Sequence, residues 1–297
     1  MTTASLNSKY PQRFRLESIV TARTALGNQE AFLGVSISKT LVLRLFLFTV
    51  FANGFFADAM LFVQSNGFFF SLLSLFGISL IKVYACWMVM SKVDQAKLEL
   101  EGWLDYAAVA GLCVLLVAPI SGLTWAGLSA VVAYFIVRPG RLNDEGRAIG
   151  LVLVGLSFST FWGKFIARIF MEQILFFDAK LVSLFSGTGS EGNLVNSLDG
   201  SVTLVVTEGC SSFSNISLAF LAWLVARLAW GTKGFGRSVM FVSLNIAIVL
   251  VVNSVRIACI AWWPQHYTLI HGPIGANIVN VILTVSILSV VNYGARR

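Results

Sequence analysis

The chain contains 297 residues, of which 57% are hydrophobic and only 12% are charged. Soluble domains are roughly half apolar and about a quarter charged, so this composition excludes an ordinary water-soluble domain and indicates a protein embedded in lipid. The net charge of +7 does not require a nucleic-acid partner, because the positions of Lys and Arg follow a membrane topology.

Residues 1–38 are predicted to form a basic cytoplasmic N-terminal arm. The stretch has no sustained helical periodicity, so we expect it either to be disordered or to lie on anionic lipid. No cleavable secretory signal is expected. The first forty residues are polar, and the first apolar stretch is long enough to remain in the membrane.

Residues 39–297 are predicted to form an all-α, polytopic integral membrane helical bundle. A membrane-spanning helix needs about 20 consecutive apolar residues. By this measure about eight candidate spans follow one another: 41–62, 67–90, 104–120, 123–137, 148–170, 211–230, 238–262 and 274–293. The third and fourth are short and are joined by Pro119-Ile-Ser-Gly122, which is typical of a tight hairpin.

The distribution of Lys and Arg predicts that both termini are cytoplasmic. Cytoplasmic connections of membrane proteins are enriched in these residues, and here alternate connections carry them while the intervening ones contain only Lys180. The basic residues in question are Lys9, Arg13, Arg15, Arg23, Lys39, Lys92, Lys97, Arg138, Arg141, Arg147, Lys233, Arg237, Arg296 and Arg297. The alternation requires an even number of spans between 41 and 147, which favours counting the short hairpin as two.

The long connection on the outer side covers residues 171–209. Its first part, 171–185, is amphipathic and aromatic, which is typical of a helix that lies along the membrane interface. Its last part, 201–206, has the composition of a strand. We expect this part either to hold the entry to the next span rigid or to provide an edge with which an extended substrate pairs.

Cys210 lies where that polar connection turns into an apolar span. The side chains that follow it favour the start of a helix; they are Ser211, Ser212, Ser214 and Asn215. A thiol near the positive end of a helix dipole is biased towards the thiolate, the nucleophilic form of cysteine. We therefore predict that Cys210 is reactive. The alternative is that it serves as a small buried hydrophobic residue.

The other cysteines are Cys86, Cys113 and Cys259, and all three lie inside predicted spans. We expect them to be inert packing residues. No CxxC spacing or Cys/His cluster occurs, so neither a metal site nor a cofactor is expected. Lys164 lies within the fifth predicted span, where it would need a partner such as a carboxylate.

Two further residues belong to the same outer side as Cys210. Arg256 lies near the outer end of the seventh predicted span, where a guanidinium is costly unless it faces protein, water or an anion; the alternative is that it snorkels to lipid headgroups. Asn253 lies one turn earlier on the same helix face. His271 precedes Gly272-Pro273 at the start of the eighth span and is a candidate general acid or base.

These groups form a set suited to acyl transfer through a thioester. Cys210 is the predicted nucleophile, His271 the proton carrier and Arg256 a cation that could stabilise an oxyanion or hold a carboxylate. Glu208 would either orient His271 or simply solvate the loop. The predicted substrate-binding residues are Glu208, Ser211 and Asn253.

Over residues 205–280 the sequence resembles the exosortase/archaeosortase family. The resemblance rests on a Cys at the outer head of one span, Asn-x-x-Arg-Ile late in the next (Asn253 to Ile257), and His-x-x-x-Gly opening the last (His271 to Gly275). It implies a membrane-embedded cysteine peptidase or transpeptidase in which Cys210, Arg256 and His271 act together.

The implied partner is the C-terminal tail of exported proteins, which consists of a short motif, a transmembrane helix and a basic end. Membrane lipids and an amine-bearing acceptor are further expected partners, water is the alternative acceptor, and no nucleic acid is expected. The implied location is the plasma (inner) membrane with the site facing the periplasm or exterior. The family often has Gly two residues after the Cys, whereas Ser212 stands here, which indicates a divergent subgroup.

Two other classes of function remain open at this point. A transporter or scaffold would use Arg256 and Lys164 to bind its substrate and would not need Cys210. A membrane acyltransferase would modify a lipid or polysaccharide precursor without cutting a protein.

Overall fold

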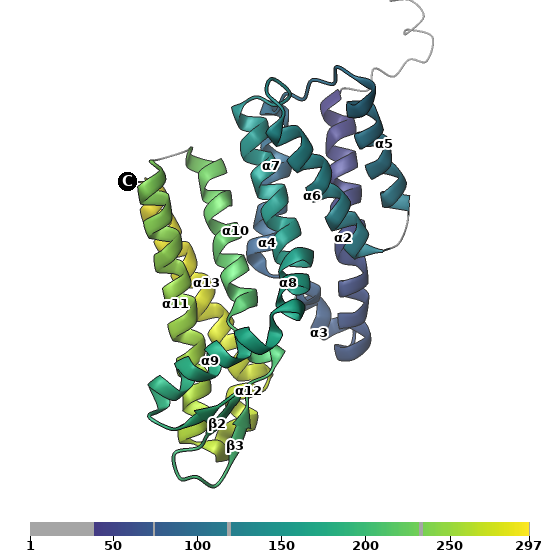
Figure 1. Cartoon of the computed structure of the whole chain (residues 1–297). Helices are drawn as coiled ribbons and strands as arrows, with labels where there is room; N and C mark the ends of the chain where they lie inside the picture. The colour runs from purple at the N-terminus through teal and green to yellow at the C-terminus, as the bar shows by residue number, and fades with distance from the viewer. Residues whose placement is uncertain (1–38, 74, 118–119, 232–233, 297) are drawn as a thin grey trace, which may run out of the picture. The chain divides into compact units, whose positions relative to one another are not determined.

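The computed structural model describes residues 39–73, 75–117, 120–231 and 234–296 (Figure 1). The predicted N-terminal arm, residues 1–38, lies outside them. The chain divides into two compact units, 1–43 and 44–297. Its longer helices are α2 (Lys39–Asn66), α4 (Leu80–Lys92), α5 (Trp103–Val117), α6 (Ser121–Val137), α7 (Asp144–Ser157), α8 (Gly163–Ile169), α9 (Met171–Ser186), α10 (Phe213–Trp230), α11 (Phe235–Trp262) and α13 (Pro273–Arg296).

The predicted all-α membrane architecture is confirmed in its main feature. Five helical runs are long and apolar enough to cross a membrane: 41–66, 144–169, 213–230, 236–262 and 274–294. The run 144–169 joins α7 to α8 through one π-helical stretch, Phe158–Trp162. These five runs are compatible with a multi-pass membrane protein.

The other three predicted spans form shorter helices. Residues 67–90 are divided into α3 (Phe68–Leu73), a 3-10 turn (Leu75–Gly77) and α4. The break has a local cause, because Phe76 adopts a left-handed conformation and Ser79 then caps α4 by accepting a hydrogen bond from the backbone N–H of Ile81. Helices α5 and α6, from the predicted hairpin, pack against each other.

The C-terminal helices form the scaffold of the site. Helix α11 packs against α9, α10 and α13, and α10 also packs against α7. The approach of α7 to α10 is close: a Cβ atom at Gly155 would lie 2.7 Å from Cδ1 of Leu224. A side chain at position 155 would therefore require the Leu224 side chain to move.

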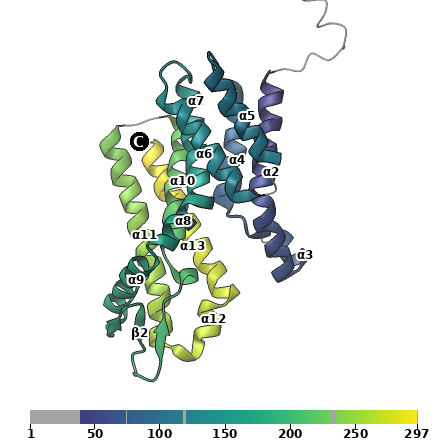
Figure 2. The ribbon, with the colours of Figure 1, turned by 45° about the vertical axis from the view of Figure 1, so that its right-hand side comes forward.

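A small sheet and α12 (Tyr267–His271) gather with α9 at one end of these helices (Figures 1 and 2). The sheet has the order β1 (Ser190–Glu191), β2 (Leu194–Asn196), β3 (Thr203–Val205), and both pairings are antiparallel. The predicted strand at 201–206 is thus confirmed as β3, which among the described residues is an edge strand paired with β2 alone. The predicted amphipathic segment 171–185 is confirmed as α9, whose buried residues include Leu175, Ala179 and Val182.

Candidate functional site

Cys210 ends a short 3-10 turn, Glu208–Cys210, between β3 and α10. Its backbone N–H donates to the Thr207 carbonyl at 2.9 Å. The residue is only 7% exposed and packs in an apolar cluster with Val206 and with residues of α9, β2 and α11. Both expectations for Cys210 therefore have a structural basis, because the thiol is buried and also lies at the approach to a helix.

Two buried side chains hold the loop that carries Cys210. Asn253 of α11 donates from Nδ2 to the Cys210 carbonyl at 2.6 Å and to Oγ of Ser212 at 3.0 Å. Asp178 of α9 accepts a hydrogen bond at Oδ2 from the backbone N–H of Ser212 at 3.1 Å. Burial raises the pKa of Asp178, although hydrogen bonds from Ser212 and Ser211 oppose this shift. The turn is thus tied to two helices.

The thiol of Cys210 faces the imidazole of His271. Their Sγ and Nδ1 atoms are 3.6 Å apart, which is within hydrogen-bonding reach for sulfur. Oγ1 of Thr207 also lies 3.6 Å from the same sulfur and can donate to it. The His271 ring stacks on Tyr267, with ring centroids 4.9 Å apart. The stacking holds the plane of the imidazole beside the thiol.

Arg256 reaches the segment that carries His271. Its Nε donates to the Ile270 carbonyl and its Nη2 to the His271 carbonyl, both at 3.3 Å. These carbonyls lie at the C-terminal end of α12, where a cation is favourable. Burial lowers the pKa of His271, and the charge of Arg256 lowers it further. The imidazole is therefore biased towards its neutral form, which can accept a proton.

Cys210 and His271 both line a cavity of about 390 Å³, called the site cavity below. Residues 202–207 form one wall, and the remaining lining is mostly apolar, with Ile257, Ile260 and Tyr267 among it. A cavity of this size and character accommodates a few residues of an extended, apolar chain.

The β3 edge presents free backbone groups on this wall. Leu204 lies opposite Val195 of β2, the Val206 N–H donates to the Asn193 carbonyl, and the Val202 carbonyl accepts from the Ser197 N–H. Backbone groups alternate in direction along a strand, so the N–H and C=O groups of Thr203 and Val205 point away from β2.

The structure brings together Cys210, Asn253, Arg256 and His271 but places two predicted substrate-binding residues elsewhere. Glu208 is exposed, and with Ser211 it lines a separate cavity that also contains Lys164. The Oγ atom of Ser211 accepts the backbone N–H of Phe213 at 3.2 Å. Asn253 is buried and bonded to the Cys210 loop, and it does not line the site cavity.

Sequence reasoning missed Asp178, Thr207 and Tyr267. A signal existed for Asp178, since it lies on the apolar face of the amphipathic segment together with Leu175 and Val182, where a carboxylate needs a partner. Thr207 and Tyr267 carry no comparable signal. Lys164, to which the sequence assigned no role, has a carboxylate partner, because its Nζ lies 3.1 Å from Oδ2 of Asp58.

The remaining cysteines are free thiols that do not line the site cavity. Cys113 is exposed on α5, and Cys86 and Cys259 are half-buried. No protein-family model matches the chain, and neither does any curated protein or solved structure, so what the site does has to be argued from its own geometry.

Proposed function

We propose that this protein is a membrane-embedded cysteine peptidase or transpeptidase of the exosortase/archaeosortase type. The observation that carries the proposal is the 3.6 Å approach of Cys210 Sγ to His271 Nδ1 at the wall of the site cavity. A thiol paired with a neutral imidazole is the minimum set for nucleophilic catalysis by cysteine.

In the first half of the reaction, His271 accepts the thiol proton and Cys210 attacks a peptide carbonyl. A carbon–sulfur bond forms, the peptide carbon–nitrogen bond breaks, and His271 returns the proton to the leaving amine. In the second half, His271 takes a proton from the acceptor, either an amine or water. The acceptor then attacks the thioester and releases Cys210, which recovers its proton from His271.

Arg256 contributes mainly as a positioning residue in this scheme. Its two hydrogen bonds hold the carbonyls of Ile270 and His271, and its charge lowers the affinity of His271 for a proton. Arg256 does not line the site cavity, so in this scheme it acts through His271 and not by contact with the substrate.

The substrate we propose is the C-terminal tail of an exported protein: a short motif, a transmembrane helix and a basic end. The motif would lie extended along β3 and pair with Thr203 and Val205, as peptides do when they extend a sheet. Side chains of the motif would enter the apolar site cavity. The tail helix and the acceptor, such as an amine-bearing lipid, would approach from the membrane.

The experiment co-expresses the full chain with exported proteins whose C-termini have this tail pattern and follows their mass. We expect the wild type to remove the tail and Cys210→Ala to reduce cleavage by at least ~10³-fold, because the nucleophile is lost. Cys113→Ala is the matched control, since Cys113 is a free thiol outside the site. Intact cleavage by Cys210→Ala would overturn the proposal.

The thiol–imidazole pair can also be tested without a substrate. Alkylation of Cys210 in the purified protein is followed at pH 7 by site-resolved mass spectrometry, with Cys113 as the internal reference. We expect His271→Gln to slow alkylation of Cys210 on the order of tenfold, because the imidazole no longer takes the thiol proton. Equal alkylation rates of Cys210 in the wild type and in His271→Gln would show that the imidazole does not activate the thiol.

The transporter or scaffold alternative has less support from the contacts. Arg256 donates to the backbone carbonyls of Ile270 and His271, so the cation proposed for substrate binding beside Cys210 already has partners in the protein. The acyltransferase alternative would use the same thiol–imidazole pair. It is separated from the peptidase by the mass of the tail protein, which an acyltransferase would leave uncut.

A further inference from the structure

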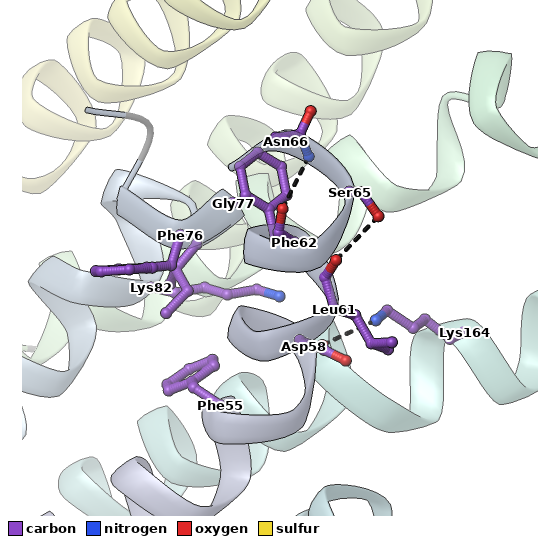
Figure 3. A pocket seen from close by; sticks show the side chains of 11 residues that line it. Phe55, Asp58, Leu61, Phe62, Ser65, Asn66, Phe76, Gly77, Lys82 and Lys164 are labelled. Atoms are coloured by element: carbon purple, nitrogen blue, oxygen red, sulfur yellow. Dashed lines mark hydrogen bonds and ion pairs between the residues drawn. The ribbon is translucent and has the colours of Figure 1, made fainter. Parts of the chain in front are cut away.

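A second cavity, of about 360 Å³, lies between α2, α4 and α8 (Figure 3). Phe55, Phe62 and Phe76 contribute aromatic side chains to its wall. Asp58, Lys82 and Lys164 line the same space, which we call the charged cavity. Ionisable groups in a membrane protein are costly unless they are paired, hydrated or engaged with a ligand. Each charged group of this cavity therefore needs a partner, water or a ligand.

The charges of the cavity do not balance. Asp58 of α2 pairs with Lys164 of α8 at 3.1 Å, and both side chains remain partly accessible, at 44% and 53% of their surface. Lys82 of α4 extends into the same space (Figure 3), yet within the described ranges it has neither a hydrogen bond nor an ion pair. One carboxylate therefore faces two ammonium groups.

Neighbouring groups leave this excess of one positive charge in place, because they add one cation and one carboxylate. Asp58 and Lys164 also line an adjoining cavity of about 250 Å³, to which Arg168 contributes a third cation. Glu208 lines a further cavity with Lys164, from the direction of the Cys210 loop. Ser65 and Asn66 cannot supply a counter-charge, and they donate to the carbonyls of Leu61 and Phe62 in their own helix.

We propose that the charged cavity binds a phosphate group, with Lys82 as its principal cation and Lys164 as the second. A phosphate presents several acceptor oxygens, so one group can meet two ammonium donors that approach from different helices. The aromatic wall suits an apolar portion attached to that phosphate, as in the headgroup of an anionic lipid. Asp58 competes with the ligand for Lys164.

This arrangement makes two substitutions act in opposite directions. Lys82→Gln removes the unpaired cation while keeping much of the side-chain volume, so phosphate binding should weaken on the order of tenfold, the equivalent of one charge-assisted hydrogen bond. Asp58→Asn removes the competing carboxylate and frees Lys164, so binding should strengthen. A purely structural role for the cluster would make both variants bind less.

The experiment uses the full chain in nanodiscs that contain either phosphatidylcholine alone or phosphatidylcholine with phosphatidylglycerol. Lipid that remains bound after extraction is measured by native mass spectrometry, and inorganic phosphate is added in a separate arm as a competitor. Lys92→Gln is the matched control, because it makes the same substitution at the other end of α4 and does not line the cavity. Circular dichroism and the melting temperature verify that each variant folds.

A lipid headgroup is supported as the source if the wild type preferentially retains phosphatidylglycerol. This preference should be lost in Lys82→Gln, kept in Lys92→Gln and increased in Asp58→Asn. Lys82-dependent binding of inorganic phosphate without a lipid preference supports a soluble phosphate instead. Equal retention of both lipids without phosphate binding overturns the proposal, as does an equal loss in the two lysine variants.

Discussion

At the Cys210 site, the buried polar groups around the thiol bond to one another, whereas Lys82 in the charged cavity has no hydrogen bond or ion pair among the described residues. Asn253 and Asp178 both hold the loop at Ser212, and Arg256 holds the carbonyls beside His271. Satisfied groups of this kind keep a fixed geometry, which a reaction needs. An unsatisfied cation in an accessible cavity is suited instead to receiving a ligand.

The largest effect on stability should come from removing the amide that holds the Cys210 loop. Asn253→Leu leaves the carbonyl of Cys210 unpaired in a buried place, which costs about 1–3 kcal/mol. Asn245→Leu is the matched control on the same helix, because the Asn245 side chain is buried and its polar atoms have no hydrogen-bond partner in the described part of the chain. We expect that variant to be neutral or stabilising.

Both variants are compared by thermal unfolding in detergent and by the alkylation rate of Cys210. Equal losses in the two proteins would show that burial of an apolar side chain in α11, and not the bond to the loop, determines the effect.

A second substitution tests whether the β3 edge binds substrate. Val205 is 56% exposed and its N–H points away from β2, so Val205→Pro removes an outward donor without breaking a bond of the sheet. Tail cleavage should fall on the order of tenfold, while Cys210 alkylation stays unchanged. Val205→Ala keeps the N–H and should retain most of the cleavage.

A smaller effect is expected from pH. The pKa of His271 is lowered in the folded state, so the unfolded chain binds more protons and stability is lost as the pH falls below the ordinary value of about 6.5. The melting temperature should therefore decrease on acidification through this range. His271→Gln should remove that part of the decrease, and His266→Gln, at an exposed position, should leave it in place.

The smallest effect concerns the independence of the two regions. Lys82 belongs to α4 and does not line the site cavity, so Lys82→Gln should change the Cys210 alkylation rate by less than about twofold, within the usual additivity of distant sites. A large change would mean that the charged cavity and the thiol are coupled, with Lys164 and Glu208 as the connection to examine.

Much of the fold could be predicted because it depends on local patterns. Runs of apolar residues predicted the long helices, the strand-like composition of 201–206 predicted β3, and the amphipathic pattern of 171–185 predicted α9. The division of 67–90 escaped prediction, because that stretch is apolar throughout and its break depends on the left-handed backbone at Phe76 and the cap at Ser79.

The sequence by itself determined that the chain is apolar enough for a membrane. It also placed Cys210, Arg256 and His271 near the predicted outer ends of three successive spans. Only the tertiary structure decided which groups meet. Cys210 and His271 are 61 residues apart in the chain, and Ser212 and Asp178 are 34 apart. Such contacts depend on how α9 and α11 pack, and the periodicity of a helix specifies which of its faces is buried but not which residue of another helix it will touch.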